Sequence, residues 1–178
     1  MTLYKFLISL LTAAFLSAAV LAQDGPAPYQ LGAGDQIRVT VYGEEDLSGE
    51  FEIDGTGTIS LPLVGSVVIG GNKVSDAEAR IVALLVDGYL VTPRVSIEVL
   101  NYRPFYIIGE VKQPGSYPYV SGMTVLNAIA LGSGFTYRAS EKKVEITRRI
   151  DGKESKISVA VTAQVFPGDI IRVAERFF

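Results

Sequence analysis

The residues of this chain that could carry acid-base chemistry are carboxylates. The 178-residue sequence contains 19 Asp and Glu but no His and no Cys. A Ser-His-Asp triad, a Cys-His pair and the usual zinc sites therefore cannot be assembled from it. Two segments are rich in acidic side chains, residues 44–46 (EED) and residues 50–54 (EFEID). Paired carboxylates are the groups that hydrolyse glycosidic bonds, so these two segments are the candidates for catalysis.

The spacing of the acidic residues favours a surface over a catalytic site. Glycoside hydrolysis requires two carboxyl groups that face each other across a cleft at a defined separation. Glu50, Glu52 and Asp54 alternate with Phe51 and Ile53, so on a strand their carboxylates all point to the same side. We interpret them as a solvent-facing or pore-facing surface, and we predict no catalytic residue, no metal and no cofactor. A secreted carbohydrate-active enzyme that uses these carboxylates is the alternative.

The charge of the chain argues against a nucleic-acid partner. The sequence has 16 Lys and Arg against 19 Asp and Glu, which gives a formal net charge of -3 at pH 7. Proteins that bind nucleic acid or anionic lipid by electrostatics present a basic face. We therefore expect no nucleic-acid partner.

The first 22 residues have the pattern of a cleavable export signal. One lysine precedes an apolar run over residues 6–19, and Val20-Leu21-Ala22 supplies small residues where a signal peptidase cleaves. The apolar run is short for a membrane span of about 20 residues, although a retained anchor is the alternative. Because no Cys follows the run, we expect a mature chain that begins near Gln23 and carries no lipid.

Hydrophobic periodicity divides the first half of the remaining chain into strands and one helix. Residues 23–28 form a lead-in that contains Pro and Gly. Apolar and polar residues alternate as on strands over 37–42, 50–54, 58–61 and 94–100. Asp54-Gly55 is a turn signal that predicts a hairpin between the second and third of these strands. Residues 75–87 show the helical period, with Ser75 and Glu78 in the capping-box pattern and Gly88 at the expected end.

The pattern begins again after Pro104. Strands are predicted over 105–111, 116–120, 142–150, 154–161 and 170–174, with a helix over 124–131. Asp151-Gly152 predicts a second hairpin. Short strands with one helix in each half predict an α+β fold with two small β-rich domains, and not a doubly wound parallel sheet.

A short internal similarity connects the two ends of the mature chain. Residues 34–39 (GDQIRV) are similar to residues 168–173 (GDIIRV). We interpret this as a shared way of turning into a strand, in which Gly provides backbone freedom and Asp binds nearby backbone amides.

An ordered set of motifs resembles the bacterial polysaccharide biosynthesis/export protein family. The motifs cover nearly all of the mature chain, and they are residues 29–35 (YQLGAGD), 46–48 (DLS), 54–55 (DG) with 59–65 (ISLPLVG), 93–97 (PRVSI), 109–117 (GEVKQPGSY), 128–130 (AIA) with 132–136 (GSGFT), and 167–169 (PGD). The resemblance implies a polysaccharide-export domain over 29–103, followed by a soluble-ligand-binding β-grasp (SLBB) domain over 104–178.

The resemblance also implies a function and partners. Such proteins form periplasmic rings associated with the outer membrane, through which capsular polysaccharide or exopolysaccharide leaves the cell, with an inner-membrane copolymerase as partner. The sequence departs from well-known members because it has no lipidation cysteine, one β-grasp repeat and no C-terminal amphipathic helix. We therefore expect a periplasmic conduit or adaptor that hands the polymer to a separate outer-membrane β-barrel. A small outer-membrane β-barrel formed by this chain itself is a further alternative.

Aromatic and basic side chains are the candidates for contact with the polymer. Tyrosine rings pack against sugar rings, and arginines bind hydroxyl or carboxylate groups. The candidates are Tyr102, Tyr106, Tyr117, Tyr119, Tyr137, Arg148 and Arg149. The alternative is that the tyrosines fill a small core or a subunit contact, and that the two arginines lie at a solvated strand end.

Overall fold

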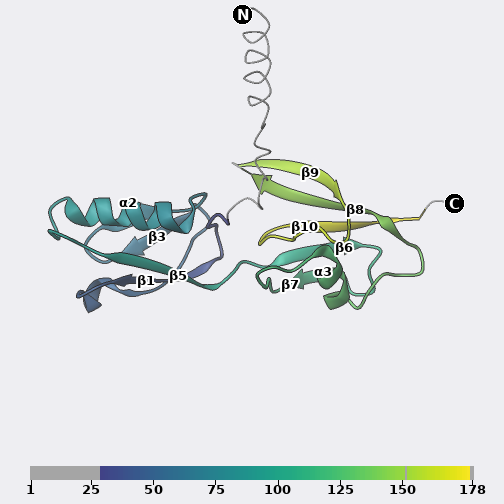
Figure 1. Cartoon of the computed structure of the whole chain (residues 1–178), viewed down its shortest axis with the longest axis horizontal. Coiled ribbons are helices and arrows are strands. Elements are labelled where there is room, and N and C mark those ends of the chain that lie inside the picture. The colour runs from purple at the N-terminus through teal and green to yellow at the C-terminus, as the bar shows by residue number, and fades with distance from the viewer. Residues whose placement is uncertain (1–28, 151, 177–178) are drawn as a thin grey trace, which may run out of the picture.

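The computed structural model describes residues 29–150 and 152–176. The predicted export signal and lead-in lie outside these residues. The described chain forms two domains that lie side by side along the long axis of the molecule. They are joined where strand β5 (Val95–Asn101) leads into strand β6 (Phe105–Gly109) (Figure 1). Each domain has its own cluster of buried hydrophobic residues.

The N-terminal domain combines a three-stranded sheet, a two-stranded hairpin and one long helix. The antiparallel sheet has the order β2-β1-β5, and the hairpin joins β3 to β4. The bounds are β1 (Gln36–Val41), the 3-10 helix η1 (Glu45–Leu47), β2 (Gly49–Glu52), β3 (Thr58–Leu61), β4 (Gly65–Val68), α2 (Val74–Val86) and β5 (Val95–Asn101).

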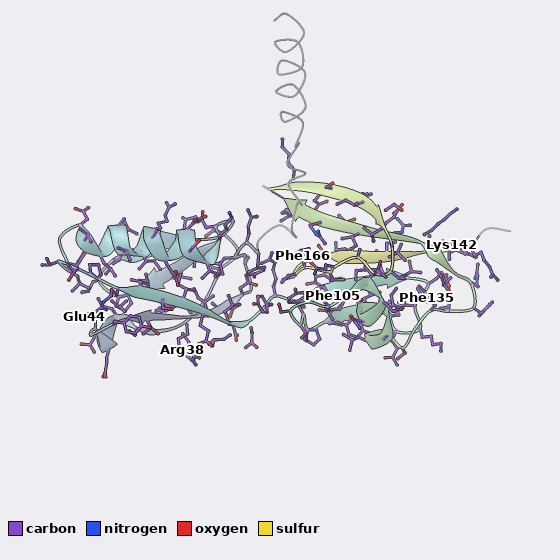
Figure 2. All side chains as sticks on the ribbon, viewed as in Figure 1. Arg38, Glu44, Phe105, Phe135, Lys142 and Phe166 are labelled. Atoms are coloured by element: carbon purple, nitrogen blue, oxygen red, sulfur yellow. The ribbon has the colours of Figure 1, made fainter. Side chains whose placement is uncertain are left out.

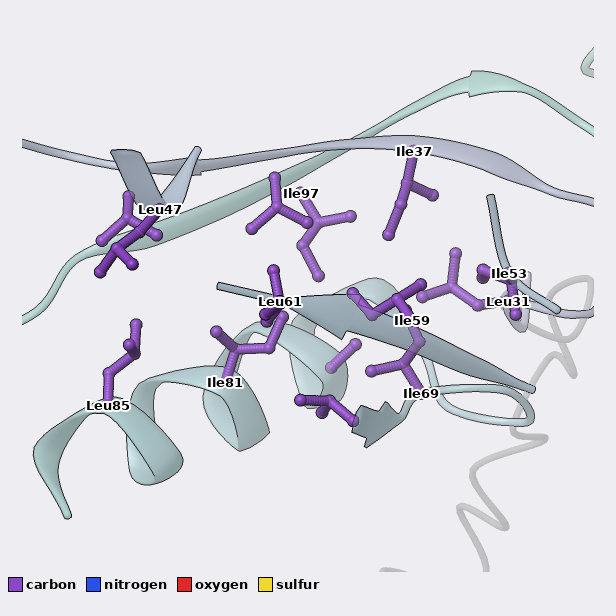
Figure 3. Packing of buried hydrophobic residues seen from close by; sticks show 14 residues of the cluster. Leu31, Ile37, Leu47, Ile53, Ile59, Leu61, Ile69, Ile81, Leu85 and Ile97 are labelled. Carbon is purple, nitrogen blue, oxygen red and sulfur yellow. The ribbon is translucent and has the colours of Figure 1, made fainter. Parts of the chain in front are cut away.

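Helix α2 covers the N-terminal core with the face that the sequence predicts. Ile81 and Leu85 point from the helix toward β1 and β5, with Leu61 of β3 close to Ile81 (Figure 3). These side chains are almost completely buried, whereas Leu84, which the periodicity also places on this face, is partly exposed. The helix therefore closes one side of a core whose other side is the three-stranded sheet.

Two local predictions for this domain are wrong. Helix α2 begins at Val74 with Lys73 as its N-cap, which makes no side-chain cap hydrogen bond. Ser75 thus lies within the first turn, and the Glu78 carboxylate accepts a hydrogen bond from the backbone N–H of Ile97 instead. Strands β2 and β3 belong to different sheets, so the turn after Asp54 leads from one sheet to the other and forms no hairpin.

The C-terminal domain is a five-stranded sheet with one short helix. The sheet has the order β7-β6-β10-β8-β9, and β6 and β10 are parallel while the other neighbours are antiparallel. The bounds are β6 (Phe105–Gly109), β7 (Gly115–Tyr117), α3 (Val125–Leu131), β8 (Ala139–Ile150), β9 (Lys153–Val159) and β10 (Ile170–Glu175). The predicted β8–β9 hairpin is confirmed.

The C-terminal core lies between this sheet and α3. Phe105 and Ile107 of β6 and Ile171 of β10 are fully buried together with Val125 and Ile129 of the helix. One helix held against a mixed sheet is the β-grasp arrangement, so the predicted fold class, α+β with two small β-rich domains and a β-grasp-like second one, is confirmed. No helix within the described residues has the length and apolar character needed to cross a membrane.

Thr124→Ala is expected to destabilise the C-terminal domain by about 1 kcal/mol, the usual cost of losing an N-cap. Thr124 caps α3 in a full capping box with Asn127, in which each side chain bonds the other residue's backbone N–H. The matched control is Ser75→Ala, which removes a hydroxyl that caps nothing. It should change the unfolding free energy by less than about 0.5 kcal/mol. Urea unfolding of both variants checks this, and equal losses would contradict the cap assignment.

Candidate binding groove between the two domains

A cavity of about 440 Å³ lies where the two domains meet. One wall comes from the N-terminal domain and consists of residues 30–33 with Gly71. The opposite wall is the tip of the β8–β9 hairpin, residues 147–149 with Gly152 and Glu154. The base consists of Arg103, in the linker, and of residues 167–170, in the turn that leads into β10. Ligand sites in proteins are commonly found at such domain interfaces.

The β8–β9 hairpin forms one wall of the groove because its two strands extend beyond the end of the neighbouring strand β10. Strand β10 pairs with β8 only as far as Ile170 opposite Thr147, whereas β8 and β9 remain paired up to Ile150 opposite Lys153. The end of the hairpin therefore has no strand β10 beside it and projects toward the N-terminal domain (Figure 1). This overhang places Arg149 and Glu154 along the groove.

Asp35 is a fully buried carboxylate at the domain boundary. It accepts hydrogen bonds from the backbone N–H groups of Gly32 at 2.7 Å and Arg103 at 2.9 Å, and from Arg103 Nη1 at 2.9 Å. The hydroxyl of Tyr29 donates a further hydrogen bond to it. A buried charge is stable only when it is paired and hydrogen-bonded, and Asp35 meets both conditions.

Asp169 repeats this arrangement in the C-terminal domain. It is 1% exposed, accepts from the backbone N–H of Phe166 at 2.8 Å, and binds Arg148 through Nε at 2.9 Å and Nη2 at 2.7 Å. The Arg148 guanidinium also lies 4.2 Å from the centre of the Phe166 ring. Figure 2 shows Phe166 at the end of this domain that faces the N-terminal domain.

The two buried aspartates belong to the similar hexapeptides at the two ends of the mature chain. The sequence interpretation is confirmed in its local part, because each Asp binds the N–H three residues before it and each preceding glycine has a positive φ. It missed the arginine partners, which lie 68 and 21 residues away in the chain. Among the described residues, Asp35 and Asp169 are the two charged side chains that are buried. The repeat of an Asp in the two similar hexapeptides was the feature of the sequence that could have pointed to these buried ion pairs.

Arg103 lies between the two Gly-Asp turns. A Cβ atom at position 32 would lie 2.5 Å from Arg103 Nη1, and one at position 168 would lie 2.9 Å from Arg103 Nε. In addition, the backbone N–H of Gly168 donates to the carbonyl of Pro104 at 3.1 Å. Glycine at both positions leaves room for the Arg103 side chain to lie against the turns of both domains.

Three tyrosine rings extend this contact in a chain. The rings of Tyr29 and Tyr102 are 5.0 Å apart and nearly perpendicular, and those of Tyr102 and Tyr119 are 5.2 Å apart in the same edge-to-face arrangement. Burial, followed by the hydrogen bond to Asp35, raises the pKa of Tyr29 well above its usual range. Burial also raises the pKa of Tyr102. The three rings therefore pack against one another, and the raised pKa values keep Tyr29 and Tyr102 neutral at physiological pH.

The seven candidate contact residues do not form one site. Arg148 and Arg149 line the groove, and Arg149 pairs with Glu154 at 3.1 Å. Tyr102 and Tyr119 belong to the aromatic chain at the joint, and Tyr117 stacks on Phe105 with ring centres 6.0 Å apart. Tyr106 and Tyr137 are exposed, 44% and 89%, at other places on the C-terminal domain. None of the five tyrosines is among the described residues that line the groove.

The acidic segments lie away from this groove. Glu50 pairs with Arg38 at 2.7 Å on the exposed side of the N-terminal sheet, and Figure 2 shows Arg38 and Glu44 on the side opposite α2. Asp54 accepts bonds from Thr56 and Thr58 in its turn, and these hydrogen bonds hold its pKa below the usual range. Within the described residues, acidic side chains form no cluster of three that could hold a metal ion.

Tyr29→Phe is expected to lower the unfolding free energy by about 1–2 kcal/mol at pH 8, because the hydroxyl bonds to a buried carboxylate. Because the pKa of Tyr29 is raised in the folded state, its contribution to stability is fully present at pH values below 10.0, the ordinary pKa of tyrosine. That contribution is lost as pH rises above this value, since the unfolded tyrosine then ionises and the folded one does not.

Urea unfolding of the wild type and of Tyr29→Phe at pH 8 and at pH 11 measures this contribution. The advantage of the wild type should shrink at pH 11. Tyr137→Phe, which alters an exposed ring, is the control and should change the value at pH 8 by less than about 0.5 kcal/mol. An advantage that grows with pH would contradict the assignment.

Comparison with known proteins identifies relatives for both domains. Residues 23–100 match the family described as "Polysaccharide biosynthesis/export protein", and residues 104–159 match the SLBB domain. The "Exopolysaccharide production protein ExoF" of Rhizobium meliloti (strain 1021) is 34% identical over 71% of this chain and 32% of its own length. A "Polysialic acid transport protein KpsD" of Escherichia coli is 32% identical over 60% of this chain and 19% of its own length. The chain thus spans a third or less of these relatives.

Proposed function

We propose, because the chain belongs to the polysaccharide biosynthesis/export protein family, that it is a non-enzymatic component of a capsular polysaccharide or exopolysaccharide export machine. It acts in the periplasm, associated with the outer membrane, as a ring-forming conduit or adaptor for the polymer. The observation that carries this proposal is the match of an export domain and an SLBB domain, in this order, along one chain. The relatives named for exopolysaccharide production and polysialic acid transport support the substrate class.

We propose that the working units are a polysaccharide-export domain over 29–103 and an SLBB domain over 104–178, after removal of residues 1–22. Each domain has a separate hydrophobic core, and at the joint the ring of Tyr102 packs against that of Tyr119 while the Arg103 side chain lies beside Gly168. We propose that these contacts hold the second domain in a defined direction relative to the first. A defined direction is what head-to-tail packing into a closed ring requires.

The proposed partners are further copies of this chain, an inner-membrane copolymerase and a separate outer-membrane β-barrel that receives the polymer. The polymer itself is proposed to contact the exposed rings of Tyr106 and Tyr137 and the groove arginines Arg148 and Arg149. Tyr102, Tyr117 and Tyr119 are partly buried among other rings, which supports a role in packing more than direct contact.

A deletion strain tests the function. Loss of the gene should abolish polymer at the cell surface and in the medium, and plasmid-borne wild type should restore it. The purified protein should also form concentration-dependent oligomers in light scattering. Normal secretion by the deletion strain would contradict the export role, and a strict monomer in the presence of its copolymerase would contradict the ring.

A further inference from the structure

We propose that the groove between the two domains holds one or two sugar units of the exported polymer through their hydroxyl groups, and not through acidic groups on the sugars. This inference rests on the proposed export function.

The charges along the groove are balanced. Arg103 pairs with Asp35 at 2.9 Å, Arg148 with Asp169 at 2.7 Å, and Arg149 with Glu154 at 3.1 Å. Sites that select polyanions concentrate positive charge and so produce a net attractive potential. Here each guanidinium has its own carboxylate, so an acidic polymer would gain little attraction from the groove.

Balanced pairs suit hydroxyl groups, because a hydroxyl both donates and accepts hydrogen bonds. The carboxylates of Asp35 and Asp169 are buried, so the pair that offers donors and acceptors side by side to a ligand is Arg149–Glu154. The Arg149–Glu154 pair is well exposed, with 71% and 61% of the two side chains accessible. Such surface pairs contribute little free energy, so this pair can rearrange around a ligand at small cost.

Glycines keep the groove open. Gly32, Gly71, Gly152 and Gly168 lie along it and bring no side chains that would fill it, although the N–H groups of Gly32, Gly71 and Gly168 are already bonded within the chain. The cavity volume of about 440 Å³ lies within the range in which proteins hold small ligands. That volume suits a short stretch of the polymer.

The groove lacks one common feature of tight sugar sites. Its described lining contains no aromatic side chain, so no ring stacks on the sugar and binding depends on hydrogen bonds. This fits a translocated polymer, since a pathway must bind its cargo strongly enough to admit it and weakly enough to release it. We expect transient contact, which photo-crosslinking can capture.

The experiment places a photo-crosslinking residue in the groove of the full chain, in cells that make the polymer. Ala33 is exposed and lines one wall, so Ala33→p-benzoylphenylalanine places the reactive group inside. Ala83, exposed on helix α2 and outside the lining, is the matched control. Glu154→p-benzoylphenylalanine on the opposite wall serves as a second position if the Ala33 variant does not accumulate.

Irradiation should attach polymer to the groove positions, seen as a high-mass species that contains the sugars of the secreted polymer, and not to position 83. Sugar adducts at both sites alike, at position 83 alone or at neither would overturn the inference. If the wild-type plasmid fails to restore secretion, the export proposal fails. If secretion is restored but the groove does not crosslink, only the groove assignment fails.

Charge substitution decides the chemistry of the contact. Glu154→Gln, combined with the crosslinker at Ala33, gives the groove a net positive charge while the amide still donates and accepts hydrogen bonds. For contact through hydroxyls, the crosslinking yield should remain close to that of the parent. A several-fold rise would show that acidic groups are bound and would overturn the assignment to hydroxyls.

Discussion

Gly109→Ala is expected to destabilise the C-terminal domain by at least about 3 kcal/mol, which is large for a single methyl group. Gly109 ends strand β6 with φ of +89°, and a Cβ atom there would lie 2.2 Å from the carbonyl oxygen of Val173. Val173 is its register partner on β10. Because the obstacle is backbone and not a flexible side chain, the parallel pair of strands at the centre of the sheet would have to separate.

Gly122→Ala is the matched control for this prediction. Gly122 has a similar φ of +81°, but a Cβ atom there meets nothing within 4 Å. Its substitution should cost only the backbone penalty of about 1–2 kcal/mol. Urea unfolding followed by circular dichroism compares the two variants. Equal losses would show that the close approach of Gly109 to β10 is unimportant.

Asp35→Ala is expected to cost about 3–5 kcal/mol, the range for breaking a buried ion pair by removing one partner. The substitution removes the acceptor of the backbone N–H groups of Gly32 and Arg103 and the carboxylate partner of the Arg103 guanidinium. Arg103 Nη1 keeps the Tyr29 hydroxyl and the Gln30 carbonyl as acceptors, and the Arg103 side chain is partly exposed, so the loss should fall toward the lower end of the range.

Unfolding measurements on Asp35→Ala and on two companion variants test this role. Glu52→Ala removes an exposed carboxylate from strand β2 of the same domain and should change stability by less than about 0.5 kcal/mol. Asp169→Ala should resemble Asp35→Ala, because its carboxylate has the same kinds of partner in the other domain. A loss below about 1 kcal/mol for Asp35→Ala would refute the proposed role of the buried pair.

Local patterns predicted most of the elements correctly. The alternation over residues 58–61 and the helical period near 75–87 match β3 and, to within one residue, α2. These signals depend on neighbours only a few residues apart, which the sequence displays directly. Strand β4 was missed, because its four residues Gly65-Ser66-Val67-Val68 bury only Val67 and so carry almost no periodicity.

Strand pairing and capping required the tertiary structure. Asp54-Gly55 looks like a hairpin turn, but β3 pairs with β4 and β2 pairs with β1, so the two strands that flank the turn are not paired with each other. Likewise, Glu78 bonds to Ile97 of β5 and not to its own helix terminus. In both cases the local sequence pattern predicts a nearby partner, whereas the folded sheet brings a different partner into contact.

The sequence by itself determined the two-part α+β organisation, the family and the absence of His and Cys chemistry, because these follow from composition, periodicity and ordered motifs. The tertiary structure alone decided that Asp35 meets Arg103, that Asp169 meets Arg148, and that a groove lies between them. The repeated Gly-Asp pair is visible in the sequence, but the arginine that binds each of the two aspartates is not. Asp35 and Arg103 stand near the two ends of the N-terminal domain, 68 positions apart, so their ion pair forms only when that domain folds, and no local pattern encodes it.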